Sequence, residues 1–479
     1  MDRKRMSRRD LLRLTGVGAA GLVLAACGPT PTPAAEPTKA EEAATAAPEA
    51  TSTPLPAVEV PPTNTPVPPR LFGQGKMEIV VWYQDWEGAT KVMTALTPGF
   101  IETHPDATVN LQAIGYGDLM AKTLPAIAAG TEGDVLMGYT NWVVGTDVSQ
   151  VYLDLTDAVG GAKTLGEQMW ESALSVTDMP EGKVFYFPWT AGIRGACLTV
   201  NQDHMKEQDI DYLNFQSWEE VIEAGKAVTQ KNADGKITRA GFSPTSSNGV
   251  FLFSLIWQLG GKFYDKESGK WSLNSPEGEE AAQMLYDIYW KHQTCDWELF
   301  TSEFQAVSQK LVSIWGDGAW TAGFQIDSAG VPADNIVCPV LQNATEKVLY
   351  PDHIGIWALS RQLKNNQDKM KVALDYAFLM VSPEALFSVF DIYSGVCMTK
   401  AVYESPEIEK VKYGPMSKRV ATGMWPIARY PQDHVANYGP AYTELSLAMR
   451  KETSIKEALA AMDTYMQSQE DEARERIGI

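Results

Sequence analysis

Apolar strands and amphipathic helices alternate between residues 76 and 137, and this alternation constrains the fold more than any other feature of the chain. Residues 76–82 (KMEIVVW) form a β-branched run that predicts a buried strand, and residues 107–114 and 134–137 predict two more. Between them, residues 90–103 and 118–130 predict helices, the second of which ends at a glycine. Strands that alternate with helices in this way are typical of a parallel α/β sheet.

Aromatic and polar residues follow the first and the third of these strands. Trp82 alternates with Val80 inside the first strand and is expected to belong to the core, whereas Tyr83 is expected to lie beyond the strand end. Open sheets bind ligands beyond the carboxyl ends of their strands, so both stretches predict a binding site. The residues alone leave three interpretations open: an acid/base pair, a cradle for a sugar, or an aromatic strand end. The candidate residues are Tyr83, Asp85, Trp86, Glu87, Tyr139, Asn141 and Trp142.

The chain from residue 183 onward predicts a second part of the fold. Ser217 and Glu220 have the spacing of a capping box, which marks the start of a helix. The other predicted elements are two strands in 183–201 with a break at 188–195, hairpins at 232–236 (NADGK) and 265–270 (DKESGK), and helices at 436–451 and 454–468.

The first residues predict export. Residues 1–26 begin with basic side chains that include the pair Arg8-Arg9, which is typical of a twin-arginine signal. The apolar stretch 14–26 is shorter than the roughly 20 residues that a membrane span needs, so it predicts a signal peptide. The sequence LAAC ending at Cys27 resembles a bacterial lipobox and predicts lipidation of that cysteine. The alternative is an ordinary signal with an unrelated cysteine.

A tether is predicted from residue 27 to residue 75. This range is rich in Pro, Thr, Ala and Glu and has few large apolar residues, so it cannot bury enough surface to fold. Its prolines make it a semi-rigid spacer. Lipidated cysteine and spacer together predict an extracytoplasmic body anchored to the outer face of the cell membrane.

The size and charge of the chain bound its class. Roughly 400 residues follow the tether, which is too many for one core and predicts two domains. The formal net charge is −20, and residues 1–26 contain six basic and two acidic side chains, so their removal leaves a body near −24. Such an acidic body argues against nucleic acid and anionic lipid surfaces as partners.

The sequence predicts no metal site, no cofactor and no nucleophile motif. The five histidines are scattered, and NADGKITRAGF lacks the closing Glu of a calcium-binding loop. The G-x-S-x-G pattern of serine hydrolases is absent. Cys197, Cys295, Cys338 and Cys397 are predicted to be either disulfide partners or isolated buried thiols.

An ordered set of motifs spans about residues 76–468. VWYQ is followed by GFIETHPDATV, DLMAKTLPAIAAGTEGDVLM, YLDLTD, GKVFYFPWTAGIRGACLTVN and SWEEVIEAGKAV, and then by LGGKFYD, VSIWGDGAW, IGIWALS, FLMVSPEA and TSIKEALAAMDTYMQ. By this order the chain resembles the family 1 extracellular solute-binding proteins of ABC importers, the group that includes maltose-binding protein. It departs from the family pattern at Val200-Asn201, where Tyr normally precedes Asn; this difference concerns packing.

The resemblance implies a two-lobe α/β fold of the type II periplasmic-binding-protein kind, in which each lobe is a mainly parallel sheet flanked by helices. It implies a monomer without enzymatic activity that closes on a small-molecule ligand and delivers it to the membrane subunits of an ABC transporter. Lobe 1 would hold residues 76–191 and 356–400 and lobe 2 residues 196–354 and 420–470, with crossings near 191–195, near 355–360 and after Met398.

The resemblance also adds candidate residues in lobe 2 and at the crossings. Sugars present apolar C–H faces and a rim of hydroxyls, so their sites combine flat aromatic rings with carboxylates and amides. The chain has 14 Trp, and a mono- or oligosaccharide is the expected ligand. Trp357 is expected either to pack in the hinge or to contact the ligand. The added candidates are Trp189, Arg194, Asn248, Asp317, Trp320, Trp357, Trp425 and Arg429.

Two other functions stay open at this point. The many carboxylates also suit a cationic ligand such as a polyamine, to which aromatic rings add cation–π contacts. Asp85 and Glu87 could instead form a glycosidase pair, but residues two apart usually sit on one loop and do not flank a substrate.

Overall fold

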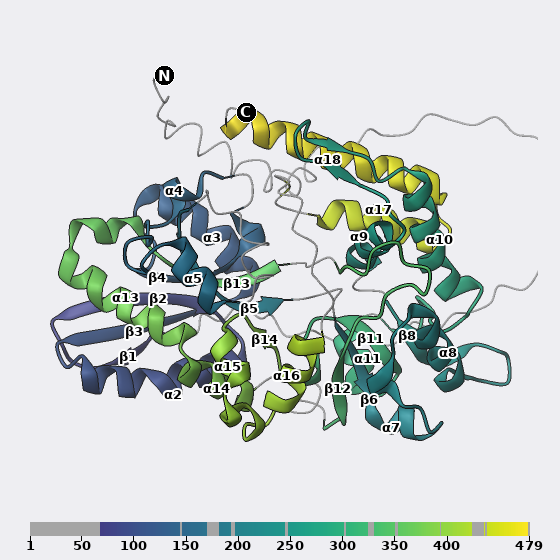
Figure 1. Cartoon of the computed structure of the whole chain (residues 1–479), viewed down its shortest axis with the longest axis horizontal. Coiled ribbons are helices and arrows are strands. Elements are labelled where there is room, and N and C mark those ends of the chain that lie inside the picture. The colour runs from purple at the N-terminus through teal and green to yellow at the C-terminus, as the bar shows by residue number, and fades with distance from the viewer. Residues whose placement is uncertain are drawn as a thin grey trace, which may run out of the picture. The chain divides into compact units, whose positions relative to one another are not determined.

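The computed structural model describes residues 68–143, 146–169, 182–192, 197–244, 248–300, 303–323, 330–349, 353–392, 394–423, 435 and 438–477 (Figure 1). The predicted signal segment, Cys27 and most of the predicted tether lie outside these residues. Strand β1 (Arg70–Phe72) lies inside the range 27–75, however, and pairs antiparallel with β3 (Ala107–Ile114). The expected end of the tether at residue 75 is therefore wrong, because a strand of this length is defined by its ladder and carries no periodic signal.

A seven-stranded sheet forms lobe 1, in the order β1-β3-β2-β4-β13-β5-β14. β2 is parallel to β3 and β4, whereas β13 is antiparallel to both β4 and β5. The α/β alternation is confirmed, but the sheet is mixed and not mainly parallel. Parallel neighbours need a crossover connection within the sheet, and β13 arrives from the other lobe instead. The remaining strands are β2 (Met77–Gln84), β4 (Val135–Tyr139), β5 (Tyr186–Gly192), β13 (His353–Leu359) and β14 (Val396–Cys397).

Helices cover both faces of this sheet. Helix α13 packs on β2, β5 and β13, and α3 packs on β2. The predicted glycine stop of α3 is confirmed: Gly130 adopts the left-handed conformation (φ 68°), which glycine enters without steric cost. The helices are α2 (Glu87–Thr103), α3 (Tyr116–Ala129), α4 (Val148–Val151), α5 (Ala162–Gln168), α13 (Gln367–Val381), α14 (Pro383–Ile392) and α15 (Lys400–Glu404), with 3-10 turns η1 (Thr140–Trp142), η4 (Arg361–Asn365) and η5 (Pro406–Glu409).

A five-stranded sheet forms lobe 2, in the order β12-β6-β11-β8-β7. Among the described pairs of this sheet only β8 and β11 are parallel, so this sheet also departs from the expected mainly parallel one. Both predicted hairpins are confirmed, as β7–β8 and β9–β10. The strands are β6 (Cys197–Asn201), β7 (Gln230–Lys231), β8 (Ile237–Ser243), β9 (Tyr264–Asp265), β10 (Lys270–Trp271), β11 (Val312–Asp317) and β12 (Ala333–Val337).

The helices of lobe 2 begin where the sequence marks them. The capping box is confirmed: Ser217 Oγ accepts from the Glu220 N–H at 3.2 Å, and Glu220 Oε2 accepts from the Ser217 N–H at 3.1 Å. The two predicted C-terminal helices are present and pack against each other. The helices are α7 (Gln202–Lys206), α8 (Trp218–Val228), α9 (Asn248–Gln258), α10 (Pro276–Trp290), α11 (Glu303–Ser308), α16 (Gly414–Gly423), α17 (Gly439–Met449) and α18 (Ile455–Ile477), with the 3-10 turn η2 (Tyr212–Asn214).

The chain passes between the two sheets after β5 and after β12, and two predicted limits near these passages are wrong. Pro188 was expected in a break but lies inside β5, opposite Ile356, where the ladder shifts register. Proline donates no hydrogen bond, so such an irregularity is where a strand tolerates it. Residues 355–360 were expected to form the second crossing, but most of them lie in β13, and the passage runs between Val337 and His353.

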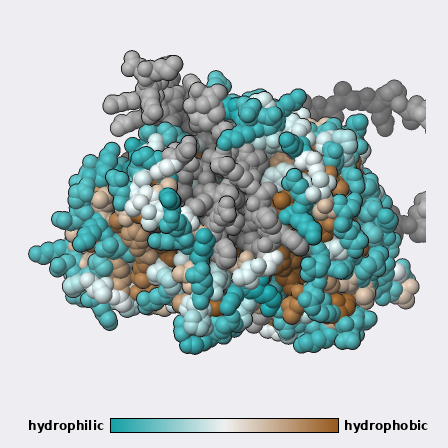
Figure 2. Space-filling model, viewed as in Figure 1, coloured by the Kyte–Doolittle hydropathy of each residue, from teal (hydrophilic) through white to brown (hydrophobic). Residues whose placement is uncertain are grey.

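The surface and the thiols agree with the composition. Hydrophilic residues cover most of the coloured face in Figure 2, as the formal charge of −20 leads one to expect. In the described chain no single helix has the length and hydropathy of a membrane span. The pair α13 and α14, bent by 52°, meets these two criteria only when both helices are taken together.

Cys197, Cys295, Cys338 and Cys397 are free and buried, so these cysteines are isolated thiols.

Candidate functional site

The carboxyl ends of three neighbouring strands of lobe 1 gather the first group of candidate residues. β2, β3 and β4 are parallel and adjacent, and they end at Gln84, Ile114 and Tyr139. The loop after β2 is tied to the end of β3, because the Asp85 N–H donates to the Ile114 carbonyl at 2.7 Å. This edge is where the sequence predicted a ligand site.

Three aromatic rings meet at this edge, and we call Tyr116, Tyr139 and Trp142 the aromatic triad. The ring centroids of Tyr139 and Trp142 lie 5.0 Å apart, and those of Tyr116 lie 5.6 Å from Tyr139 and 5.5 Å from Trp142. All three pairs are edge-to-face, the arrangement that ring quadrupoles favour. The Tyr139 hydroxyl donates to Gln84 Oε1, which fixes that ring to the end of β2.

Two polar atoms, one next to the triad and one in it, lack a hydrogen-bond partner among the residues that the structure describes. They are Asn141 Oδ1 and Trp142 Nε1, both buried, on the 3-10 turn that follows β4. A buried polar atom without a partner costs on the order of 1–3 kcal/mol, so such atoms tend to be satisfied by a ligand or by water.

The loop after β2 carries Asp85, which is exposed, and Trp86, which is half-buried. The indole of Trp86 lies directly over Gly88, where any Cβ would overlap it. Glycine at this position therefore lets the ring lie flat on the first turn of α2. Glu87, another predicted site residue, lies in the same turn, and its side chain is outside the part of the chain that the structure describes.

The two aromatic residues before this loop belong to the strand. Trp82 is buried and donates from Nε1 to Gln112 Oε1 at 3.0 Å, which confirms its predicted place in the core. The expectation that Tyr83 follows the strand end is wrong, because pairing with β3 extends β2 through Gln84. The Tyr83 side chain is 1% exposed and its hydroxyl lies 3.3 Å from Thr90 Oγ1, so it packs under α2. Burial raises the pKa of this phenol.

Lobe 2 presents a second group of candidates at strand and helix ends. Asp317 ends β11 and is buried, with Thr321 Oγ1 3.5 Å from its Oδ2. Trp320 is half-buried and lies over Gly318, as Trp86 lies over Gly88. Asn248 begins α9, donates to the Tyr289 hydroxyl at 3.0 Å, and has no partner for its buried Oδ1 in the described part of the chain.

Trp189 and Trp357 lie on the crossing strands and pack against each other. Their ring centroids are 5.6 Å apart, and the side chains are 3% and 0% exposed. Of the two roles weighed for Trp357, this geometry favours packing between β5 and β13. Arg194, Trp425 and Arg429 lie outside the described residues.

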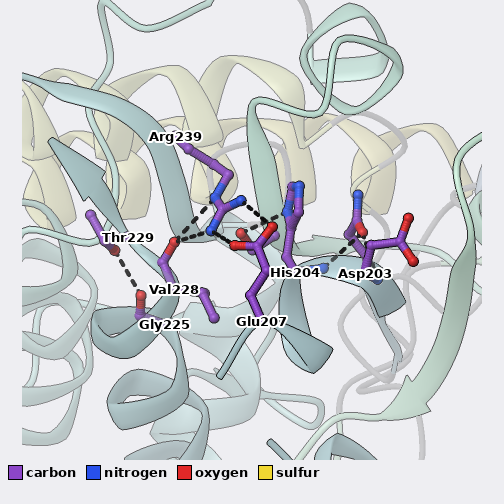
Figure 3. Close-up of polar contacts among 9 residues, drawn as sticks. Asp203, His204, Glu207, Gly225, Val228, Thr229 and Arg239 are labelled. Carbon is purple, nitrogen blue, oxygen red and sulfur yellow. Dashed lines mark hydrogen bonds and ion pairs between the residues drawn. The ribbon is translucent and has the colours of Figure 1, made fainter. Parts of the chain in front are cut away.

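A charge network in lobe 2, formed by the buried Arg239 and the exposed Glu207, is an example of a structural ion pair in this protein (Figure 3). Arg239 donates to both Glu207 oxygens, at 3.0 and 2.6 Å, and to the Val228 carbonyl. His204 Nδ1 lies 3.0 Å from Ser313 Oγ, and burial, with Arg239 as the next cause, lowers the pKa of His204 to about 4. Arg239, Glu207 and His204 each have a protein partner here, and the network holds β8 to α7 and α8. Within the described chain no group of three His, Cys, Asp or Glu side chains could hold a metal ion.

Sequence reasoning missed Tyr116 and Asp118, which follow β3 as the other candidates follow β2 and β4. The available signal was GYGD at residues 115–118, directly after the second predicted strand. Tyr116 is 43% exposed, the most open ring of the triad, and Asp118 is exposed in the first turn of α3.

Comparison with known proteins shows the family of the chain. The profile of the family described as bacterial extracellular solute-binding protein matches residues 85–385. The chain belongs to this family. Its membership confirms a solute-binding protein that acts outside the cytoplasm, and it gives no support to the glycosidase interpretation of Asp85 and Glu87.

Individual relatives of this solute-binding protein are distant. The arabinooligosaccharide-binding protein of Halalkalibacterium halodurans is 28% identical over 116 residues, and the alignment spans 24% of each chain, about a quarter of that relative. The maltose/maltodextrin-binding domain from Bdellovibrio bacteriovorus, bound to maltotriose, has a TM-score of 0.64 and 17% identity, with 82% of this chain and 100% of that chain covered. The maltotriose-binding protein of Thermus thermophilus, bound with maltotriose, has a TM-score of 0.63 and 17% identity, with 81% and 99% covered. These likenesses confirm the predicted two-lobe fold.

Proposed function

We propose that this solute-binding protein is a lipid-anchored receptor that captures a carbohydrate between its two lobes and delivers it to the membrane subunits of an ABC transporter. The observation that carries the proposal is the aromatic triad at the carboxyl edge of the lobe 1 sheet, bordered by polar atoms without partners. A sugar matches both features, since its C–H faces stack on rings and its hydroxyls both donate and accept.

In this proposal each lobe supplies part of the ligand-binding site. Lobe 1 supplies rings and hydrogen-bonding groups from Asp85, Trp86, Tyr139, Asn141 and Trp142. Lobe 2 supplies Asn248, whose orphan Oδ1 can accept from a hydroxyl, with Asp317 and the half-buried indole of Trp320. Closure about the crossing strands would bring the two groups together on a ligand. Glu87, Arg194, Trp425 and Arg429 stay sequence predictions of further contacts.

The relatives support an oligosaccharide rather than a cation as the ligand. The two solved structures compared above carry maltotriose, and the relative found by sequence is named for arabinooligosaccharides. A polyamine remains the second candidate, because Asp85 and Asp118 both expose carboxylates beside aromatic rings.

Calorimetry on the soluble body separates these ligands. The panel contains glucose, maltose, maltotriose, α-1,5-arabinotriose and spermidine, each titrated at the same ionic strength. We expect binding to at least one oligosaccharide and none to spermidine. Binding to spermidine alone would overturn the carbohydrate proposal and favour the cationic ligand.

Membrane anchoring is proposed from Cys27 and the tether that follows it. A Cys27→Ala variant should move from the membrane fraction to the soluble fraction on cell fractionation. Retention of this variant in the membrane would contradict a lipid anchor at that position. We also propose that the receptor is a monomer, which light scattering of the soluble body would test.

A further inference from the structure

Tyr116 is the member of the aromatic triad whose ring is exposed to solvent. Its ring lies 5.6 Å from the ring of Tyr139 and 5.5 Å from that of Trp142, both edge-to-face. The two supporting rings differ from it in exposure: Trp142 is buried and Tyr139 half-buried, whereas Tyr116 is 43% exposed. Two packed rings thus hold the third in place while part of its surface stays open to solvent.

The backbone on each side of this ring leaves room for a ligand. Tyr116 lies between Gly115 and Gly117, and a Cβ added at Gly117 would meet no atom within 4 Å. A Cβ at Gly115 would meet only Asp118 Oδ2, at 3.7 Å. Neither glycine has a left-handed φ, so backbone conformation does not explain their presence. The glycines keep space open beside the exposed ring.

Two exposed carboxylates belong to the segments next to Tyr116. Asp118 is in the first turn of α3, two residues from Tyr116. Asp85 belongs to the adjoining loop after β2. Its N–H donates to the carbonyl of Ile114, which is the last residue of β3 and lies two residues before Tyr116 in the chain. Carboxylate oxygens accept hydrogen bonds from sugar hydroxyls, and they repel a ligand that carries its own carboxylate.

We propose that Tyr116 is a specificity-determining residue of this receptor, which stacks a sugar ring on lobe 1, and that Asp85 and Asp118 restrict this subsite to uncharged sugars. The inference rests on the proposed carbohydrate function and adds to it the chemical class of the ring that lobe 1 accepts. Oligosaccharides of uronic acids are excluded by charge, and neutral oligosaccharides are admitted.

The test compares variants of Tyr116 by calorimetry with maltotriose and α-1,5-arabinotriose. Tyr116→Ala should weaken binding by about tenfold, the usual scale for loss of one stacked aromatic ring, and Tyr116→Phe should bind as the wild type does. Tyr116→Leu keeps apolar contact with Trp142 but has no flat face, so it should also lose affinity; it carries the test if the alanine variant is poorly folded. Leu71→Ala removes a 64% exposed apolar side chain from the same lobe and should leave binding unchanged.

The outcomes separate the two proposals. If the wild type binds no oligosaccharide of the calorimetry panel, the carbohydrate function and this inference both fail. If the wild type binds one of them and the alanine and leucine variants bind equally well, only the inference about Tyr116 fails. The charge limit is tested with trigalacturonate: the wild type should not bind it measurably, and binding as tight as that of the neutral trisaccharide would overturn the role of Asp85 and Asp118.

Discussion

Gly318→Ala tests whether the indole of Trp320 is a ligand platform without deleting it. A Cβ added at Gly318 would lie 2.0 Å from Cζ3 and 2.1 Å from Cη2 of that indole. Carbon atoms settle at about 3.5–4.0 Å, so the ring must move by about 1.5 Å. Trp320 is half-buried and can swing toward solvent, so we expect a stability loss of only about 1 kcal/mol.

The displaced ring should lose its stacking on the ligand. Such contacts contribute about 0.5–1.5 kcal/mol, so affinity should fall by about three- to tenfold, with a larger loss for Trp320→Ala. The measurement is calorimetry with the tightest-binding oligosaccharide of the panel, together with thermal unfolding. In the Trp320→Ala background Gly318→Ala should have no further effect on affinity, because the group it displaces is already absent.

A matched control is available in the same protein. Gly99 lies inside α2, and a Cβ there would meet nothing within 4 Å. Gly99→Ala should leave binding unchanged and add about 0.5–1 kcal/mol of stability. Wild-type affinity in both Gly318→Ala and Trp320→Ala would refute the platform, and a large fall in melting temperature for Trp320→Ala would make that residue part of the core.

Further predictions concern stability and the thiols. Glu207→Gln should lower the free energy of unfolding in urea by about 1–2 kcal/mol, because it weakens the pairing of the buried Arg239. The loss stays this small because the Glu207 side chain is 43% exposed and its charge is screened by solvent. An unchanged unfolding midpoint would contradict this prediction. The pKa of His204 is lowered to about 4 in the folded protein, whereas an unfolded histidine has a pKa of about 6.5. As the pH falls, the unfolded chain therefore binds a proton before the folded protein does, so stability should decline from about pH 6.5 to about pH 4. An NMR titration of His204 with a midpoint near 6.5 would show that reasoning to be wrong. Burial raises the pKa of Cys397 to about 12, and in a Cys27→Ser variant the four buried thiols should react with a disulfide reagent only after unfolding; fast reaction in the native state would argue against their burial.

Local signals predicted the elements that local chemistry decides. The alternation of strands and helices in residues 76–137, the capping box at Ser217 and the glycine stop at Gly130 were all readable, because each depends on residues a few positions apart. The aromatic residues at Tyr139 and Trp142 were placed at the correct sheet edge by the same strand pattern.

Long-range pairing decided the features that sequence reasoning placed wrongly. Tyr83 reads as part of a polar loop, yet its pairing with Ala113 keeps it in β2. Pro188 reads as a strand break, yet a register shift in the partner strand accommodates it. Tyr116 was overlooked because its role depends on two rings brought beside it from β4 and the turn that follows. Such contacts depend on distant parts of the chain, which a local pattern does not contain.

The position of β13 has a consequence for biosynthesis. This strand lies between β4 and β5 in the sheet of lobe 1, although well over a hundred residues of lobe 2 separate it from β5 in the chain. A nascent chain that has emerged only as far as β5 therefore lacks the strand that joins its two halves. The sheet of the first lobe cannot be completed until the whole sheet of the second has been made, and its ladder closes late because β13 must pair across a large intervening loop. The twin-arginine signal predicted from Arg8-Arg9 belongs to a route that carries folded proteins, and such a route would suit a chain whose first lobe is completed late in translation.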